Sequence, residues 1–260
     1  MDLKPVTGAP RSSGPASYGR SLTSRDVTTP IHLQATAPLA ERVLLPGDPG
    51  RALLLAQALL EGPKMFNHNR GLWGYTGTAR DGALLTIQST GMGGPSAAIV
   101  IAELAMLGAQ QLIRVGTCGA LEPSLQLGDL LIATEAITAD GASRVLSDAP
   151  RVAADPGLLA ALTNVGAGAS VSGVVASTDL FYDGPGEQSW IDAGALAVEM
   201  ETATLFALAA RRGLQAAAVL IVSDLLFPKR KRIDSDGLRE AEQRMGELAV
   251  SALRLIPSAG

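Results

Sequence analysis

Residues 83–121 read ALLTIQSTGMGGPSAAIVIAELAMLGAQQLIRVGTCGAL, and three patterns follow one another in this stretch. A short apolar run breaks at residues 91–94, and a helical apolar pattern then begins at Pro95 and ends at Gly108. Proline suits the first turn of a helix, and glycine suits the position after its last turn. A second apolar run follows and ends in a glycine loop at 116–119. The stretch therefore predicts a strand, a helix and a second strand of an α/β fold.

The same alternation continues on both sides of this unit. Further strands are predicted within residues 41–49, 128–137, 170–178, 195–200 and 214–224, and further helices within 155–166, 201–213 and 235–256. The run 214–224 is almost wholly apolar, which is typical of a strand buried on both faces. We therefore predict a single-domain α/β/α sandwich with a central mixed, mostly parallel sheet flanked by helices.

Residues 1–28 differ from the rest of the chain, because they are rich in Pro, Ser, Gly and Arg and show no hydrophobic periodicity. Such a segment cannot bury enough apolar surface to offset the entropy of ordering it. It also lacks the apolar core of a secretory signal. We expect residues 1–28 to form a disordered tail, either a solvated extension or a partner-recruiting segment, and residues 29–260 to form one domain.

The composition excludes several classes of protein. The chain has 260 residues, of which 18% are charged, and its formal net charge of −4 disfavours a nucleic-acid surface. The single cysteine, Cys118, excludes an intramolecular disulfide and is interpreted as a small packed residue. With only two histidines in addition, a metal site is disfavoured. No apolar run reaches the ~20 residues of a membrane span. We expect a cytoplasmic protein without nucleic-acid, membrane or metal partners.

Polar residues and glycines stand at the carboxyl ends of the predicted strands, where open α/β sheets bind ligands. The earlier strand ends carry glycines, arginines and a hydroxyl group, namely Gly47, Arg51, Arg114 and Thr117. Glycine amides and arginine forks suit an anion. The later strand ends carry carboxylates, a methionine and an aromatic ring, namely Phe181, Glu199, Met200, Glu201, Ser223 and Asp224. Such groups suit a sugar and a flat base, because carboxylates accept from hydroxyls or donate a proton.

Each of these groups also has a purely structural explanation. The PGDPGR sequence at 46–51 fits an ordinary turn, and residues 91–94 lack the spacing of a Walker loop or a dinucleotide fingerprint. Arg114 lies inside an apolar strand, where a charge needs a partner. Glu199 and Glu201 also fit the first turn of a helix.

Seven motifs in chain order carry a family resemblance. They are VLLPGDPGR (43–51), NRGLWGYTG (69–77), GMGGPSAAI (91–99), RVGTCGAL (114–121), STDLFY (177–182), VEMETATLF (198–206) and VSD (222–224). Together they resemble the nucleoside phosphorylases of the hexameric purine nucleoside phosphorylase and uridine phosphorylase type, and are most similar to the bacterial purine enzymes. The resemblance runs from about Ile31 to the C-terminus. It implies reversible phosphorolysis of purine (deoxy)ribonucleosides to a free base and (deoxy)ribose 1-phosphate.

The resemblance also implies a role for each matching residue. Gly47, Arg51, Arg114 and Thr117 would bind phosphate, the co-substrate, and no other cofactor is implied. Glu199, Met200 and Glu201 would hold the ribose. Phe181, Ser223 and Asp224 would face the base, with Asp224 as the proton donor to the purine N7.

Two residues are implied to act across a subunit interface. Arg70 would reach into the phosphate site of the neighbouring subunit, and His32 would contact the ribose 5′-hydroxyl there. The resemblance therefore implies a homo-oligomer, a trimer of dimers with sites shared across each dimer interface.

Asp224 favours the purine branch of the family, because uridine phosphorylases typically lack this acid. They carry a Gln/Arg pair after the FY segment, and the segment FYDGPGEQSW (181–190) shows no such pair. The string METATL (200–205) points instead to the uridine branch. A nucleosidase that uses water and a non-catalytic nucleoside-binding protein are further alternatives.

One position departs from the purine pattern. The purine enzymes place an arginine about thirteen residues after the aspartate, where it assists proton donation, and this chain has Gly237 there. Arg239 lies two residues further on, and the segment 227–232 offers Arg230 and Arg232. The sequence leaves open which of these arginines takes the role.

Overall fold

The fold is taken from a computed structural model that describes residues 29–182 and 186–256. The strands are β1 (Arg42–Leu45), β2 (Leu60–Asn67), β3 (Gly74–Ala79), β4 (Leu84–Gln88), β5 (Gln111–Ala120), β6 (Leu130–Ala139), β7 (Arg151–Ala153), β8 (Val171–Thr178), β9 (Ala195–Glu199), β10 (Gln215–Leu225) and β11 (Lys231–Arg232). The helices are α1 (Pro49–Leu59), α2 (Gly94–Leu107), α3 (Gly141–Leu146), α4 (Pro156–Val165), α5 (Gln188–Asp192), α6 (Thr202–Arg212) and α7 (Ser235–Leu253). The predicted tail, residues 1–28, lies outside the described residues.

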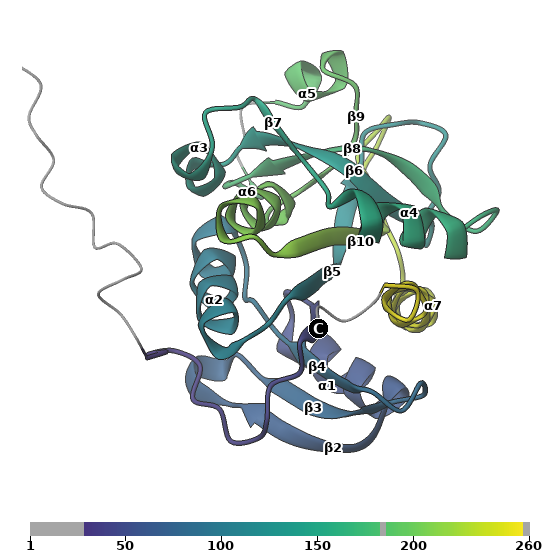
Figure 1. Cartoon of the computed structure of the whole chain (residues 1–260). Coiled ribbons are helices and arrows are strands. Elements are labelled where there is room, and N and C mark those ends of the chain that lie inside the picture. The colour runs from purple at the N-terminus through teal and green to yellow at the C-terminus, as the bar shows by residue number, and fades with distance from the viewer. Residues whose placement is uncertain (1–28, 183–185, 257–260) are drawn as a thin grey trace, which may run out of the picture.

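The strands form one mixed sheet in the order β11-β10-β6-β8-β9-β5-β1-β4-β3-β2, with β7 beside β6 (Figure 1). The strand β5 pairs with β10 as well as with β9, so β5, β10, β6, β8 and β9 close into a ring. The pairings β5–β10, β6–β8 and both pairings of β1 are parallel. The predicted mixed sheet flanked by helices is confirmed, and the ring closure is a feature that the sequence patterns did not predict.

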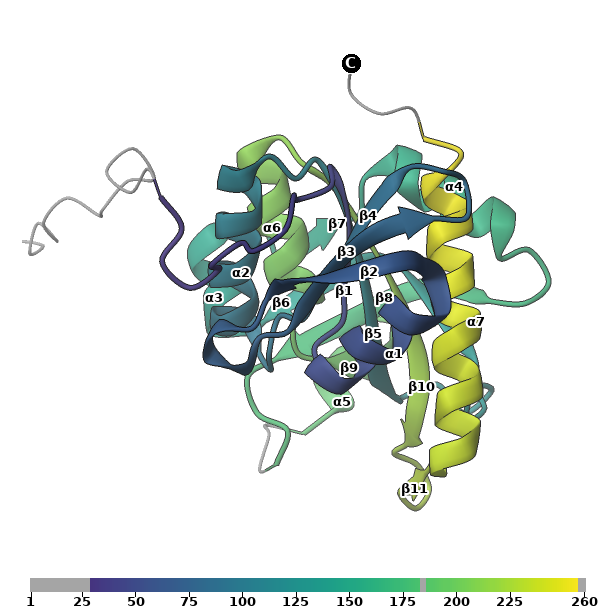
Figure 2. The same cartoon turned by 90° about the horizontal axis from the view of Figure 1, so that it is seen from below.

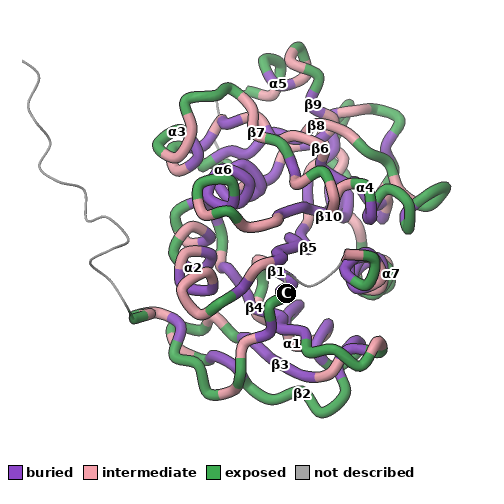
Figure 3. Tube along the Cα trace, in the orientation of Figure 1, coloured by how far each residue is buried: buried purple, intermediate pink, exposed green. Residues whose placement is uncertain are grey.

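Side chains of the central strands alternate between two hydrophobic cores, one on each face of the sheet. Along β10, Ala218 and Leu220 enter the first core, and Ala217 and Val219 enter the second. The helices α2 and α6 cover the first core, and α1, α4 and α7 cover the second (Figures 1 and 2). Figure 3 shows the resulting pattern of buried strands within a more exposed outer layer. A strand covered on both faces explains why residues 214–224 are apolar almost throughout.

The predicted helix ends are confirmed where glycine or proline marks them. Pro95 lies in the first turn of α2, and Gly108 ends that helix with φ 106°. Gly213 closes α6 with φ 68°. These left-handed conformations suit glycine, because a side chain would be strained there.

Three of the differences from the sequence prediction lie within residues 46–120. The strands β2 and β3 were not predicted. Residues 61–65 of β2 are exposed and include Pro63, and β3 contains Gly74 and Gly77, so no apolar alternation marks either strand. The strand β5 continues through the expected glycine loop to Ala120, because β9 and β10 supply backbone pairing there. The expected turn at 46–51 contains the start of α1, whose N-cap is Asp48.

Two negative findings apply to residues 29–182 and 186–256, the part of the chain that the structure describes. No helix there is long and apolar enough to cross a membrane. Nor does that part of the chain bring three or more His, Cys, Asp or Glu side chains together in a group that could hold a metal ion.

Candidate active site

A cavity of about 700 Å³ opens at the carboxyl ends of the central strands, beside the first turn of α1. Ten of the residues predicted from the sequence line it, namely Gly47, Arg51, Arg114, Thr117, Phe181, Glu199, Met200, Glu201, Ser223 and Asp224. They come from segments more than 170 positions apart in the chain, and the sheet brings them together. This is where ligands bind in open α/β sheets.

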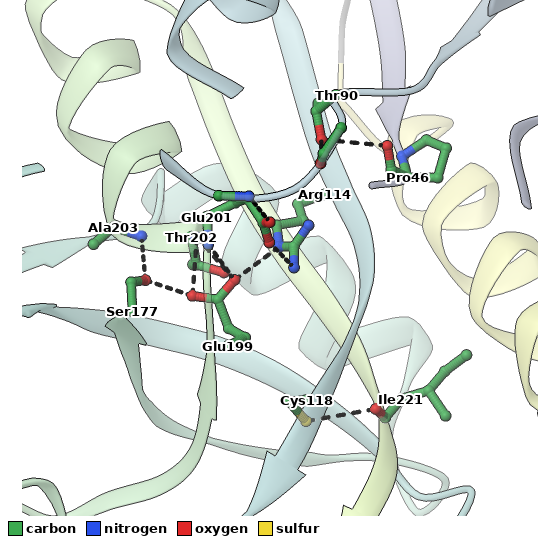
Figure 4. A network of polar contacts seen from close by, with 12 residues as sticks. Pro46, Thr90, Arg114, Cys118, Ser177, Glu199, Glu201, Thr202, Ala203 and Ile221 are labelled. Atoms are coloured by element: carbon green, nitrogen blue, oxygen red, sulfur yellow. Dashed lines mark hydrogen bonds and ion pairs between the residues drawn. The ribbon is translucent and has the colours of Figure 1, made fainter. Parts of the chain in front are cut away.

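Arg114 is the centre of a buried polar network (Figure 4). Its Nε donates to Glu199 Oε2 over 2.9 Å, and its Nη2 forms an ion pair with Glu201 Oε2 at 2.5 Å. The guanidinium folds back over Gly116, where an added Cβ would lie 2.7 Å from the guanidinium carbon. Desolvation lowers the pKa of Arg114, but the charges of Glu201 and Glu199 outweigh it and raise that pKa. Arg114 is therefore held as a cation in a buried place.

Glu199 supports its neighbours with both carboxylate oxygens. In addition to Arg114, it accepts hydrogen bonds from Ser177 Oγ and from the backbone amides of Glu201 and Thr202. Its side chain is 0% exposed. These contacts engage both carboxylate oxygens of Glu199, and its contact with the ribose stays a prediction.

Glu201 faces the cavity from the start of α6. Its Oε1 accepts from the Gly93 amide over 2.5 Å, while Oε2 contacts Arg114. Desolvation raises the pKa of Glu201 above the usual range of a glutamate, and Arg114 opposes this rise. Met200 lines the cavity beside it.

Arg51 is paired with a residue that the sequence did not single out. Its Nε donates to Glu242 Oε1 over 2.6 Å, and the two side chains are 9% and 10% exposed. Glu242 lies on α7 and also lines the cavity. The sequence did contain an indication of Glu242. It lies on the apolar face of α7 with Ala241 and Met245, and a buried acid is rare without a partner.

Asp224 and Ser223 both line the cavity, although they are neighbours in one strand. The register of β10 against β5 shifts between Val222 and Asp224, and this bulge breaks the usual alternation of side chains. Ser223 Oγ donates to Asp224 Oδ2 over 2.9 Å. The sequence alone could not show this bulge.

Arg230 completes the surroundings of Asp224. Its Nε donates to Asp224 Oδ1 over 3.1 Å, and its Nη2 lies 3.1 Å from the same oxygen. The guanidinium also stands 4.9 Å from the centre of the Phe181 ring, a distance that suits a cation–π contact. The short pairing of β11 with β10 holds this segment near Asp224.

Cys118 lines the cavity wall but is 3% exposed. Burial raises the pKa of its thiol well above the usual range. A thiol that stays protonated is a poor nucleophile. This agrees with its interpretation as a packed residue.

Three predicted residues do not line the cavity. Arg239 is exposed on α7, and the structure places Arg230 rather than Arg239 at Asp224. Arg70 is exposed in the loop between β2 and β3 and adopts a left-handed backbone, with φ 58° and ψ 19°. His32 lies beside α2, where its Nδ1 is 2.7 Å from Glu103 Oε1.

The comparison with known sequences identifies the class of protein. Residues 41–254 match the sequence family described as the phosphorylase superfamily, and the chain belongs to this superfamily. The resemblance to nucleoside phosphorylases predicted from the seven motifs is thereby confirmed.

Individual proteins with similar sequences carry more specific names than the superfamily. The chain is 43% identical over 202 residues to a purine nucleoside phosphorylase DeoD-type of Geobacillus kaustophilus (strain HTA426), which covers 75% of this chain and 85% of the relative. It is 40% identical over 233 residues to a purine nucleoside phosphorylase DeoD-type of Jannaschia sp. (strain CCS1), covering 85% and 98%. The fold is similar to the crystal structure of uridine phosphorylase from Vibrio fischeri ES114, with a TM-score of 0.74, 29% identity and coverage of 83% of this chain and 92% of that one.

Proposed function

We propose that this chain is a purine nucleoside phosphorylase, which converts a purine (deoxy)ribonucleoside and phosphate to the free base and (deoxy)ribose 1-phosphate. The observation that carries the proposal is one cavity lined by two buried arginines and by Asp224. The arginines suit the phosphate, and the acid suits the leaving base. Relatives named as purine nucleoside phosphorylases support the same conclusion.

The lining residues divide by chemistry. Phosphate binds Arg51, Arg114, Thr117 and the backbone at Gly47, near the first turn of α1, where helix N-termini favour anions. Ribose contacts Met200 and Glu201, while Glu199 positions Arg114 and Glu201 from behind. The base lies against Phe181 and faces Ser223 and Asp224.

The reaction breaks the bond between C1′ and N9 and forms a bond between C1′ and a phosphate oxygen. Positive charge develops on the sugar and negative charge on the base. The bound phosphate stabilises the sugar cation and attacks it, and protonated Asp224 transfers its proton to N7 so that the base leaves neutral. General acid catalysis of this kind contributes ~10²–10⁴ in rate, and the charged clamp on phosphate adds to it. Inorganic phosphate is the only co-substrate that this chemistry requires.

Arg230 assists Asp224 in this scheme. After Asp224 has given its proton to the base, it becomes a carboxylate at a buried position. The Arg230 nitrogens at 3.1 Å stabilise that carboxylate and thereby favour the transfer.

A second copy of the chain completes each site. Arg70 is exposed in a left-handed conformation that is costly for a residue with a side chain, and such strain is typical of functional positions. The contact of His32 Nδ1 with Glu103 orients the ring, and Nε2 can then meet a hydroxyl group of the ligand. We assign both residues to the neighbouring subunit's site, in a trimer of dimers.

The experiment is a product assay with inosine, adenosine and uridine, each with and without phosphate. We expect base release from the purine nucleosides that depends on phosphate. Uridine as the preferred substrate would support the uridine phosphorylase alternative, to which the similar crystal structure points. Release without phosphate would show a nucleosidase, and no release from any substrate would refute an enzyme of this class.

A further inference from the structure

The pair formed by Arg51 and Glu242 raises a question about the anion site. Glu242 brings a carboxylate to the wall of the cavity, directly beside the arginine that is proposed to bind phosphate. The Glu242 carboxylate and a bound phosphate are both negative and repel each other at short range. Their buried position weakens the screening of this repulsion by water. The ion pair with Arg51 offsets part of this repulsion, and a hydrogen bond from the bound anion to the carboxylate would offset more of it.

The free atoms of the pair define that role. Arg51 uses Nε to bind Glu242 Oε1, and its Nη1 and Nη2 have no hydrogen-bond partner within the described part of the chain. Glu242 Oε2 likewise has no partner among the described residues. The pair thus brings two donor nitrogens and one acceptor oxygen to the lining of the cavity, and the 2.6 Å hydrogen bond fixes the two side chains relative to each other.

Phosphate fits this set of groups, and a fully ionised oxyanion does not. Near neutral pH phosphate keeps at least one P–OH group in both of its common ionic forms. Its bare oxygens accept from Arg51, and its P–OH donates to a carboxylate. Sulfate has the same shape and carries no proton, so its oxygen would face the lone pairs of Glu242 without a hydrogen bond between them.

We propose that Glu242 selects the oxyanion: Oε2 accepts the hydrogen bond from the P–OH group, so that the site binds proton-bearing oxyanions and rejects sulfate. The inference rests on the proposed function, which places phosphate at Arg51. It differs from a purely positional role for Glu242, since a residue that only holds Arg51 in place would affect all oxyanions alike.

The first measurement uses the wild-type protein. Sulfate is tested as an inhibitor that competes with phosphate in nucleoside phosphorolysis, and arsenate, which can itself attack C1′, is tested by its competition with phosphate in the formation of ribose 1-phosphate. Arsenate carries an As–OH group and is expected to bind within about threefold of phosphate, whereas sulfate binds at least about tenfold more weakly, because hydrogen bonds to charged groups act on that scale. Sulfate binding as tight as that of phosphate or arsenate would overturn the proposal without any variant.

The second measurement compares Glu242→Gln with the wild type. Glutamine keeps the size of the side chain and can still accept from Arg51 Nε, but its amide NH₂ donates where Oε2 accepted. The ratio of the sulfate inhibition constant to the phosphate KM is expected to fall about tenfold or more, because sulfate gains a donor. Equal changes for both anions, or no change, would show that Glu242 only positions Arg51.

Glu240→Gln is the matched control. It makes the same chemical change on the same helix, at an exposed position that does not line the cavity, and is expected to leave the ratio unchanged. If the wild type shows no phosphorolysis, the proposed function fails, and calorimetric titration of phosphate, arsenate and sulfate into the same proteins still decides whether Glu242 discriminates between them.

Discussion

Asp224 lies between two groups that respond to its charge. Ser223 contacts one carboxylate oxygen and Arg230 the other, and all three reach the same cavity. A carboxyl group in this setting can give a proton to a base and then be stabilised as an anion. The amino acid at position 224 and the partners it acquires therefore act together, and each can be tested alone.

Replacing Asp224 with asparagine removes the proton donor and keeps the shape. Adenosine phosphorolysis should slow by ~10²–10⁴, the usual contribution of a general acid. Inosine should lose much less, since a 6-oxo purine has other ways to accommodate the charge of the leaving base. The kcat values for both nucleosides check this, and equal losses would contradict the role of Asp224.

Arg230→Gln tests the assisting role. We expect kcat to fall about tenfold or more with a smaller change in the nucleoside KM, because the arginine acts on the proton transfer through Asp224. Arg239→Gln serves as the control, since Arg239 is exposed and does not line the cavity. A matching loss in both variants would argue for a general effect of positive charge.

At the scale of elements, the strand β5 shows how a backbone position shapes the site. Gly116 lies two residues after Arg114, and the absence of a side chain at 116 lets the guanidinium fold back towards Glu199 and Glu201. The same residue interrupts the apolar run, so it was predicted to begin a loop. Pairing with β10 keeps it in the strand instead.

Gly116→Ala should disturb the site more than the fold. The added Cβ would lie 2.7 Å from the Arg114 guanidinium, which can yield only by a small shift within its contacts with Glu199 and Glu201. We expect the phosphate KM to rise about tenfold, because ion pairs of this buried kind are sensitive to position, while stability falls by only about 1 kcal/mol. Phosphate titrations and urea unfolding measure the two effects. A large loss of stability with an unchanged KM would contradict the explanation.

The helix α2 anchors the segment that leads into β1. Glu103 accepts hydrogen bonds from the backbone amides of residues 31–33 and from the His32 ring. Burial alone would raise the pKa of Glu103, but these hydrogen bonds outweigh it and lower that pKa below the usual range. A carboxyl group whose pKa is lowered on folding stabilises the folded state above its unfolded pKa, and this stabilisation is lost as the pH falls through the folded pKa.

Glu103→Gln should therefore destabilise the protein by about 2 kcal/mol near pH 7, the scale of hydrogen bonds to a charged group. The difference from the wild type should shrink in acid, where Glu103 becomes protonated. Urea unfolding at neutral pH and below pH ~4 checks this sign. A gap of equal size at both pH values would mean that the charge of Glu103 does not carry the effect.

At the scale of the whole molecule, the proposed site needs two copies of the chain. Arg70 and His32 do not line their own cavity, so they contribute only if a neighbour receives them. The net charge of −4 fits this arrangement, because the positive charge needed for phosphate is concentrated at a few arginines rather than spread over the surface.

Complementation between two variants that are expected to be inactive on adenosine tests the shared site. Arg70→Ala lacks the donated arginine, and Asp224→Asn lacks the acid. In a mixed dimer one site keeps both groups, so unfolding and refolding the two variants together should restore about a quarter of the wild-type activity by random pairing. Each variant refolded alone is the control. A mixture as inactive as its components would contradict shared sites.

The sequence by itself determined the class of fold and the ends of the main helices, and it singled out ten of the residues that line the cavity. Apolar periods report which faces are buried, glycine and proline report helix ends, and polar residues at strand ends report where ligands bind. These signals are local. They therefore identified Pro95, Gly108, Arg114 and Asp224 without knowledge of the residues that pack against them.

Only the tertiary structure decided which groups meet. The pairing of Arg51 with Glu242, of Arg114 with two carboxylates and of Asp224 with Arg230 joins residues from different elements. The bulge at Ser223 and the closure of β5 onto β10 likewise depend on partner strands. Charges are stabilised by neighbours in space, and the spacing of residues along the chain does not show which residues become neighbours.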